Sequence, residues 1–113
     1  MIEFVKALKV KHNLKVVAVS NEGRELAKYR IETFQLKSFI DVFIVSAFVG
    51  RRKPYEDIYR LALEVADASC PEVVYIDDRE MLAQGARAYG LDAIWHQNLE
   101  TTVRELAGRG LAL

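Results

Sequence analysis

Apolar positions along the chain alternate between two spacings, one typical of buried strands and one typical of helices. Near-continuous apolar runs of strand length occur at 14–19, 42–45, 73–76 and 93–95. Each run is separated from the next by a segment with helical spacing, and this alternation predicts a parallel sheet with helices on both faces. The expected fold class is therefore α/β, a three-layer Rossmann-like sandwich.

The segments with helical spacing predict five helices. Apolar residues at i, i+3, i+4 and i+7 are clearest from Ile58 to Val65. The second helix should place Ala27, Ile31 and Phe34 on one face, and Gly90 stands where a C-cap glycine belongs. The predicted helices run from Ile2 to about His12, from about Glu22 to Phe34, over Ile58–Val65, over Leu82–Tyr89 and from Leu99 to Ala107.

Three polar groups follow the predicted strands in an order that suits phosphate and metal binding. Ser20 and Asn21 end the first strand, Lys53 lies in the loop after the second, and Asp77 with Asp78 ends the third. In parallel sheets, ligands bind beyond the carboxyl ends of the strands. A hydroxyl, an ammonium and a carboxylate pair at that edge predict part of a phosphoryl-transfer site.

Each of these groups also has a purely structural explanation. Ser20 or Asn21 could simply cap the following helix, and Lys53 could belong to a solvated basic loop, since two arginines precede it. The acid pair could favour the dipole of the next helix. Two adjacent acids repel each other without a cation, however, and the occurrence of all three groups in order favours a functional site.

The same stretches resemble the haloacid dehalogenase superfamily over essentially the whole chain. The segment 17–21 is similar to the family's second motif, an apolar strand ending in Ser or Thr. The segment 50–59 resembles the third motif, a lysine followed by a proline that opens a helix. The segment 76–78, followed by small residues at Ala86 and Gly90, resembles the fourth, an acidic pair before a small-residue helix.

The resemblance implies a role for each group. Ser20 and Asn21 would bind a phosphoryl oxygen, and Lys53 would lie between the phosphate and a nucleophilic aspartate. Asp78 would hold Mg²⁺ more directly, with Asp77 as a helper. In the complete family enzyme an aspartate attacks phosphorus and water then hydrolyses the aspartyl phosphate of a small phosphorylated metabolite.

The family's first motif, Asp-x-Asp, does not occur in this sequence, and no aspartate precedes Asp41. Residues 1–113 are therefore expected to be a single core-domain fragment, with motifs two to four and no cap, incomplete at the N-terminal strand. The chain alone is expected to be inactive, with a homodimer or the missing N-terminal segment filling the gap in the sheet. The alternative is a non-catalytic module that binds phosphate or a protein. A receiver-like domain fits less well, because in receivers the acidic pair comes first and the lysine last.

The composition of the chain excludes some classes of binding partner and suggests a cellular compartment. The charges balance at 16 basic and 16 acidic residues, which argues against nucleic acid or an acidic membrane as a partner. No apolar run reaches the ~18 residues of a membrane span. Cys70 is the single cysteine, so a reducing, cytoplasmic location is expected, with Cys70 as a small buried residue. Trp95 is expected in the core, and His12 and His96 at the surface or at strand ends.

Overall fold

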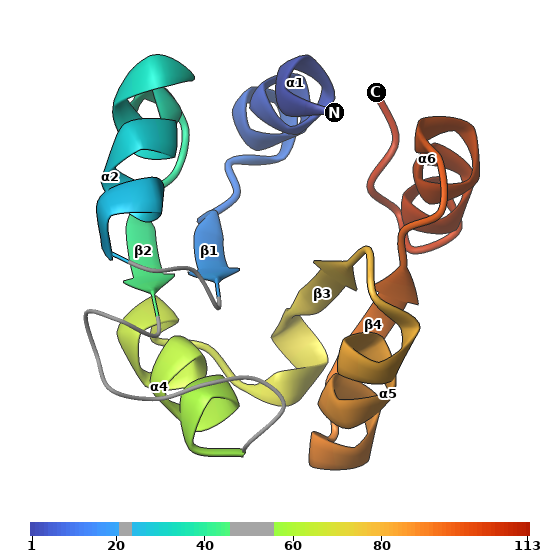
Figure 1. Ribbon diagram of the computed structural model, residues 1–113. Coiled ribbons are helices and arrows are strands. Elements are labelled where there is room, and N and C mark those ends of the chain that lie inside the picture. The colour runs from blue at the N-terminus through green and yellow to red at the C-terminus, as the bar shows by residue number, and fades with distance from the viewer. Residues whose placement is uncertain (21–23, 46–55) are drawn as a thin grey trace. The chain divides into compact units, whose positions relative to one another are not determined.

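The computed structural model describes residues 1–20, 24–45 and 56–113, in which helices and short strands alternate (Figure 1). The α/β class and the parallel strand pairing predicted from the sequence are confirmed. Among the described residues, every helix is too short or too polar to cross a membrane. The elements are α1 (Ile2–His12), β1 (Val17–Ser20), α2 (Arg24–Thr33), η1 (Leu36–Ser38), β2 (Val42–Val45), α4 (Glu56–Ala66), η2 (Cys70–Glu72), β3 (Val74–Asp77), α5 (Glu80–Tyr89), β4 (Asp92–Trp95) and α6 (Leu99–Ala107).

The chain divides into two compact units. The first unit comprises residues 1–14 and 70–113, and the second comprises residues 15–69. Each unit contains one sheet of two parallel strands in the part of the chain that the structure describes. The carboxyl ends of β1 and β3 therefore belong to different units.

In the second unit, β1 pairs with β2 from Val17↔Val42 to Ser20↔Val45. The side chains of Ile44 on β2 and of Ile58 and Tyr59 on α4 are almost completely buried, whereas Val17 to Val19 on β1 are only half-buried. Within the described residues, β1 has a strand neighbour on one edge only. Its other edge carries backbone groups of the kind that pair readily with a further strand.

The first strand begins at Val17, later than the predicted start at Leu14. The chain leaves α1 through Asn13, whose φ of 53° is left-handed, and the amide of Leu14 donates back to the carbonyl of Lys9 at 3.1 Å. The amide of Val16 then donates to the Asp41 carboxylate at 2.7 Å. These bonds occupy amides that a longer strand would have used in its ladder.

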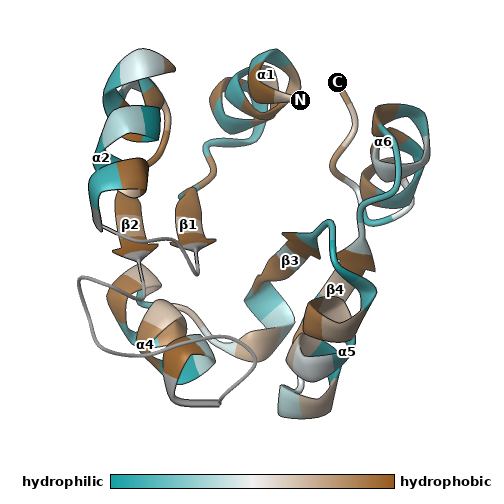
Figure 2. Cartoon of the chain, in the orientation of Figure 1, coloured by the Kyte–Doolittle hydropathy of each residue, from teal (hydrophilic) through white to brown (hydrophobic). Residues whose placement is uncertain are grey.

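In the first unit, β3 pairs with β4 from Val74↔Asp92 to Asp77↔Trp95. Leu8 of α1, Ile94 of β4 and Leu106 of α6 form a cluster of buried residues in its core. Figure 2 shows largely hydrophobic strands, as parallel strands that face a core require. The partly buried side chains packed against this cluster are Phe4, Leu14, Val74, Ile76 and Leu111.

The last residues of the chain lie against α1 in the same unit. Lys11 Nζ donates to the carbonyl oxygen of Leu113 at 2.6 Å. His12 Nε2 lies 2.8 Å from the carbonyl oxygen of Ala112, and since a carbonyl only accepts, the imidazole donates. Together with the packing of Leu111 against the core cluster, these bonds hold the last residues of the chain against α1.

Several local expectations are confirmed and others are wrong. Gly90 ends α5 with a left-handed φ of 115°, as predicted for a C-cap glycine. Phe34, which was predicted to end the second helix, follows the last turn of α2 instead and is 53% exposed. Cys70 is half-buried rather than buried, because it lies in η2, a short helix that the sequence pattern did not predict.

Candidate functional site

The structure places part of the predicted site at the carboxyl end of β3. Asp77 is the last residue of that strand and Asp78 follows it directly. Ser20 is the last residue of β1, in the other unit, and its side chain lies outside the described residues. Asn21 and Lys53 lie outside them as well, so their roles stay predictions.

The Asp77 carboxylate is buried and held by two local donors. The side chain belongs to a residue that is only 7% exposed, and its Oδ2 accepts a hydrogen bond from the Tyr75 hydroxyl at 2.7 Å. Its Oδ1 accepts from the backbone amide of Arg79 at 3.1 Å. Tyr75 and Asp77 share one face of the strand because they are two residues apart. Both of these donors are neutral, and together they fix the orientation of the carboxylate.

Asp78 differs from Asp77 because its side chain is exposed and its hydrogen bond is to the backbone carbonyl rather than to the carboxylate. Its side chain is exposed and makes no ion pair with any residue in the described ranges. Its backbone carbonyl accepts a hydrogen bond from Trp95 Nε1 at 3.1 Å. The carboxylate of Asp78 is therefore open to solvent while its backbone is fixed from a neighbouring strand.

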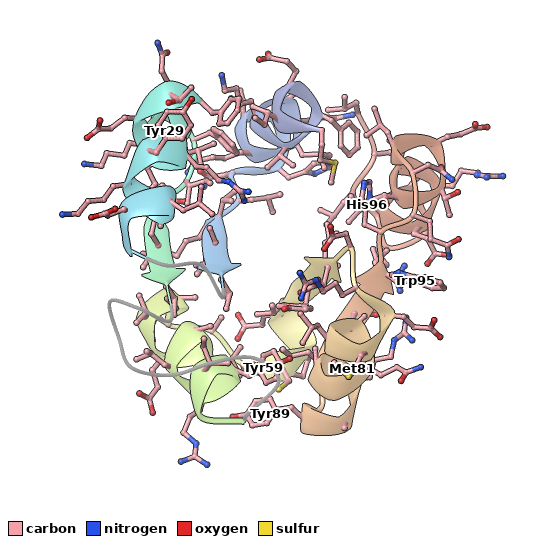
Figure 3. The ribbon with its side chains drawn as sticks, in the orientation of Figure 1. Tyr29, Tyr59, Met81, Tyr89, Trp95 and His96 are labelled. Carbon is pink, nitrogen blue, oxygen red and sulfur yellow. The ribbon has the colours of Figure 1, made fainter. Side chains whose placement is uncertain are left out.

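The end of β4 also contacts the acid pair through His96. The backbone amide of His96 donates to the carbonyl oxygen of Asp77 at 2.8 Å. The His96 ring is held in turn by Thr102, which is fully buried in α6 and whose Oγ1 lies 2.5 Å from Nδ1. Figure 3 labels Trp95 and His96 at this strand end, with side chains that point in different directions. The residues that sequence reasoning missed at this site are thus Tyr75, Arg79 and Trp95, and the alternation of Tyr75 with Asp77 was the one signal available for them.

The donors present fit Mg²⁺. Magnesium takes hard oxygen ligands and is usually held by one or two carboxylates, with water and substrate phosphate completing its shell. Asp78 offers an exposed carboxylate for direct contact, and Asp77 offers an oriented one close behind it. The described residues contain no group of three His, Cys, Asp or Glu side chains placed to hold a metal ion, so a zinc-type site has no support in them.

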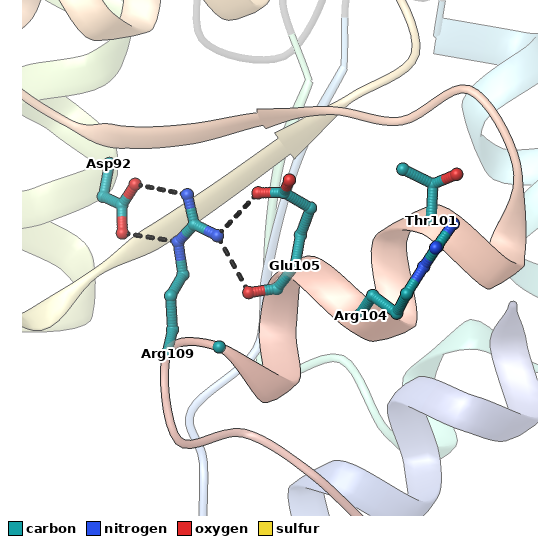
Figure 4. A pocket seen from close by; sticks show the side chains of 6 residues that line it. Asp92, Thr101, Arg104, Glu105 and Arg109 are labelled. Atoms are coloured by element: carbon teal, nitrogen blue, oxygen red, sulfur yellow. Dashed lines mark hydrogen bonds and ion pairs between the residues drawn. The ribbon is translucent and has the colours of Figure 1, made fainter.

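The opposite, amino edge of the same sheet has a different acidic group. Arg109 Nε and Nη2 donate to the two oxygens of Asp92 at 2.7 and 3.0 Å, and Arg109 Nη1 donates to Glu105 Oε2 at 2.9 Å (Figure 4). The hydrogen bond from Arg109 lowers the pKa of Asp92, and the bonds to both acids raise the pKa of Arg109. These ion pairs border a hollow of about 650 Å³ lined by Asp92, Thr101, Arg104, Glu105, Gly108 and Arg109.

This hollow contains none of the residues singled out by the sequence. Asp92 begins β4, whereas Trp95 ends it opposite Asp77 of β3, so the hollow and the acid pair lie at opposite edges of one sheet, roughly 10 Å apart at ~3.3 Å per residue. Its central charges neutralise one another. The acid pair at the carboxyl edge is therefore the better candidate for chemistry.

Comparison with known proteins gives the family. Residues 1–96 match the haloacid dehalogenase-like hydrolase family, and the chain belongs to it. The resemblance inferred from the three motifs is thereby confirmed. The membership also agrees with the α/β fold and its parallel strands.

Individual relatives cover different shares of the chain. A segment of 72 residues is 35% identical to bifunctional epoxide hydrolase 2 of Sus scrofa and covers 64% of this chain. The chain spans only 13% of that relative's length.

Two solved structures share the fold. An uncharacterised protein from Corynebacterium glutamicum aligns with a TM-score of 0.81 at 26% identity, over 96% of this chain and 80% of its own. A hydrolase from Streptococcus pneumoniae aligns with a TM-score of 0.79 at 16% identity, over 94% of this chain and 55% of its own. At this identity the second likeness shows the fold alone.

Proposed function

We propose that this chain forms the phosphate- and magnesium-binding part of a phosphohydrolase that acts on small phosphate monoesters. The observation that carries the proposal is the acid pair at the end of β3. Asp77 is buried and accepts hydrogen bonds from the Tyr75 hydroxyl and the Arg79 amide, and Asp78 is exposed with no ion pair among the described residues. Together with membership of a hydrolase family, this arrangement supports a site for a divalent cation beside a phosphoryl group.

In this proposal each residue has one task. Asp78 contacts Mg²⁺ directly, and Asp77 supports it from within the sheet edge. Ser20 and Asn21 donate hydrogen bonds to a phosphoryl oxygen, and Lys53 offsets the negative charge that develops during transfer. Bound magnesium would supply further positive charge beside the phosphoryl oxygens.

The nucleophile of such an enzyme is an aspartate in an Asp-x-Asp motif, and that motif is absent from these 113 residues. We therefore expect the chain by itself to be inactive. Hydrolysis of p-nitrophenyl phosphate in the presence of Mg²⁺ should stay at background. Magnesium-dependent turnover that is abolished by Ser20→Ala and by Asp78→Asn would contradict this expectation.

A non-catalytic module is the second candidate, and the missing Asp-x-Asp motif is the observation that favours it. The two can be separated by fusing an Asp-x-Asp strand segment from a family member to the N-terminus. If the chain is part of an enzyme, the fusion should gain p-nitrophenyl phosphatase activity. That activity should disappear when the added aspartate or Asp78 is changed to asparagine. A module would bind inorganic phosphate with Mg²⁺ and remain inactive in the fusion.

The strand edges support a proposal about assembly. Within the described residues, β1 pairs only with β2 and β3 only with β4, and no side chain from Val17 to Val19 or from Val74 to Ile76 is fully buried. Such edges invite a further strand, from a second copy or from a segment carrying Asp-x-Asp. Sedimentation at several concentrations should show association of the isolated chain. A monomer at all concentrations with one cooperative melting transition would contradict this proposal.

A further inference from the structure

We infer that Trp95 is a positioning residue for the magnesium-binding carboxylate of Asp78. Its indole N–H is the donor to the Asp78 backbone carbonyl, at 3.1 Å and across 17 residues of sequence. This inference rests on the proposed magnesium site and extends it to a residue of another strand.

The geometry of the strand pair explains why Trp95 can reach this position. The register of the parallel strands places Trp95 opposite Asp77. Asp78, the residue that follows Asp77, therefore lies beside the indole. Asp78 lies after the last residue of β3 and before α5, and its backbone carbonyl accepts the indole hydrogen bond at that point. The indole bond supplies a fixed point at the residue whose side chain must meet the ion.

A second bond from the same strand end supports this assignment. The amide of His96 donates to the carbonyl of Asp77, so both backbone carbonyls of the acid pair accept a hydrogen bond from the end of β4. The His96 ring is anchored on the buried Thr102 of α6. The end of β4 is thus itself held in place, which is the property that a support for a metal ligand needs.

The position of Trp95 also gives a direct measurement. Trp95 is the single tryptophan of the chain, so all indole fluorescence arises beside Asp78. Addition of Mg²⁺ should change the emission of the wild-type chain in a saturable way. The same titration of Asp78→Asn, which keeps Trp95, should leave the emission unchanged.

The decisive variant is Trp95→Phe, which keeps an aromatic ring and removes the donor. Loss of an outer-shell hydrogen bond typically weakens metal binding by about 10–100-fold, and because this bond acts through the backbone we expect about tenfold. The dissociation constant for Mg²⁺ would be measured by calorimetry. The melting temperature in EDTA should remain close to that of the wild type, which separates positioning from a general loss of structure.

Two controls make the test specific. Asp92→Asn changes the other end of the same strand and should lower stability while leaving the dissociation constant for Mg²⁺ unchanged. If Trp95→Phe does not fold, replacement of Trp95 by its benzothiophene analogue removes the N–H and keeps the shape. Magnesium binding as tight as in the wild type, in either Trp95 variant, would overturn the inference while leaving the proposed site intact. No magnesium binding by the wild type would overturn both.

Discussion

The two edges of the β3–β4 sheet hold acidic groups with opposite surroundings. At the amino edge, Asp92 lies in a two-pronged ion pair with Arg109, which also pairs with Glu105. At the carboxyl edge, Asp77 receives hydrogen bonds from a hydroxyl and a backbone amide, and Asp78 has no ion pair among the described residues. The same sheet therefore pairs Asp92 at one edge with a fixed guanidinium, whereas Asp78 at the other edge has an exposed carboxylate.

The difference separates acids that stabilise a fold from acids that bind. A carboxylate with a fixed guanidinium partner lowers the free energy of the folded chain and has little capacity left for a ligand. Adjacent carboxylates at a strand end repel each other, so a cation that binds beside them should stabilise the fold. Magnesium should therefore stabilise the chain through the carboxyl edge, and titration with acid should weaken the ion pair at the amino edge.

The largest expected effect concerns magnesium and Asp78. Ligand linkage predicts that Mg²⁺ at a hundredfold excess over its dissociation constant raises the free energy of unfolding by about 2.7 kcal/mol. For a chain of this size that corresponds to a rise in melting temperature on the order of 10 °C. Thermal melts with and without Mg²⁺ should show this rise in the wild type and in Asp92→Asn, and none in Asp78→Asn. Equal rises in all three chains would place the ion elsewhere.

A smaller effect is expected at the amino edge without metal. Asp92→Asn removes the partner of Arg109, and because the pair is partly exposed its loss should cost roughly 0.5–1 kcal/mol of unfolding free energy. Asp78→Asn in EDTA should cost nothing, because it relieves repulsion with Asp77. Urea unfolding of the two variants in parallel would reveal this contrast. A larger loss in Asp78→Asn than in Asp92→Asn would reverse the roles assigned to the two edges.

The smallest effect is the dependence of the Asp92 contribution on pH. Arg109 holds the folded-state pKa of Asp92 below its ordinary value. The stabilisation is therefore fully present above the unfolded pKa of about 3.9 and is lost as pH falls through the lower folded value. The stability difference between wild type and Asp92→Asn should be constant from pH 5 to 7 and shrink below about pH 4. A difference that persists undiminished at pH 2 would show that it does not arise from the charge of Asp92.

The sequence alone could locate the acid pair and most of the elements. The apolar run that ends at Ile76 predicts a buried strand, so Asp77 and Asp78 had to lie at its carboxyl end, and Gly90 correctly marked the end of a helix. These features depend on residues that are close in sequence, so a local sequence pattern can predict them. The limits of the first strand were predicted less well, because the Asp41 carboxylate that takes the Val16 amide lies 25 residues away.

The contacts that complete the site could not be predicted. The bond from Trp95 to Asp78 and the ion pair of Arg109 with Asp92 each join residues 17 positions apart. Both depend on the register between β3 and β4 or on the docking of α6, which no local pattern specifies. Trp95 was accordingly expected only as a core residue. In the structure it is half-buried, and its indole N–H donates to the Asp78 carbonyl.

The central claim is that the carboxyl edge binds the metal and the amino edge does not, and residue-resolved NMR tests it most directly. A ¹H–¹⁵N spectrum would be recorded while Mg²⁺ is added to the 113-residue chain. We predict saturable shifts for the amides of Asp77, Asp78 and Arg79 and for the single indole signal of Trp95, with the amide of Asp92 and the side-chain Nε–H of Arg109 unchanged. Shifts centred on Asp92 and Arg109, or an unchanged indole and acid pair at saturating Mg²⁺, would contradict the account.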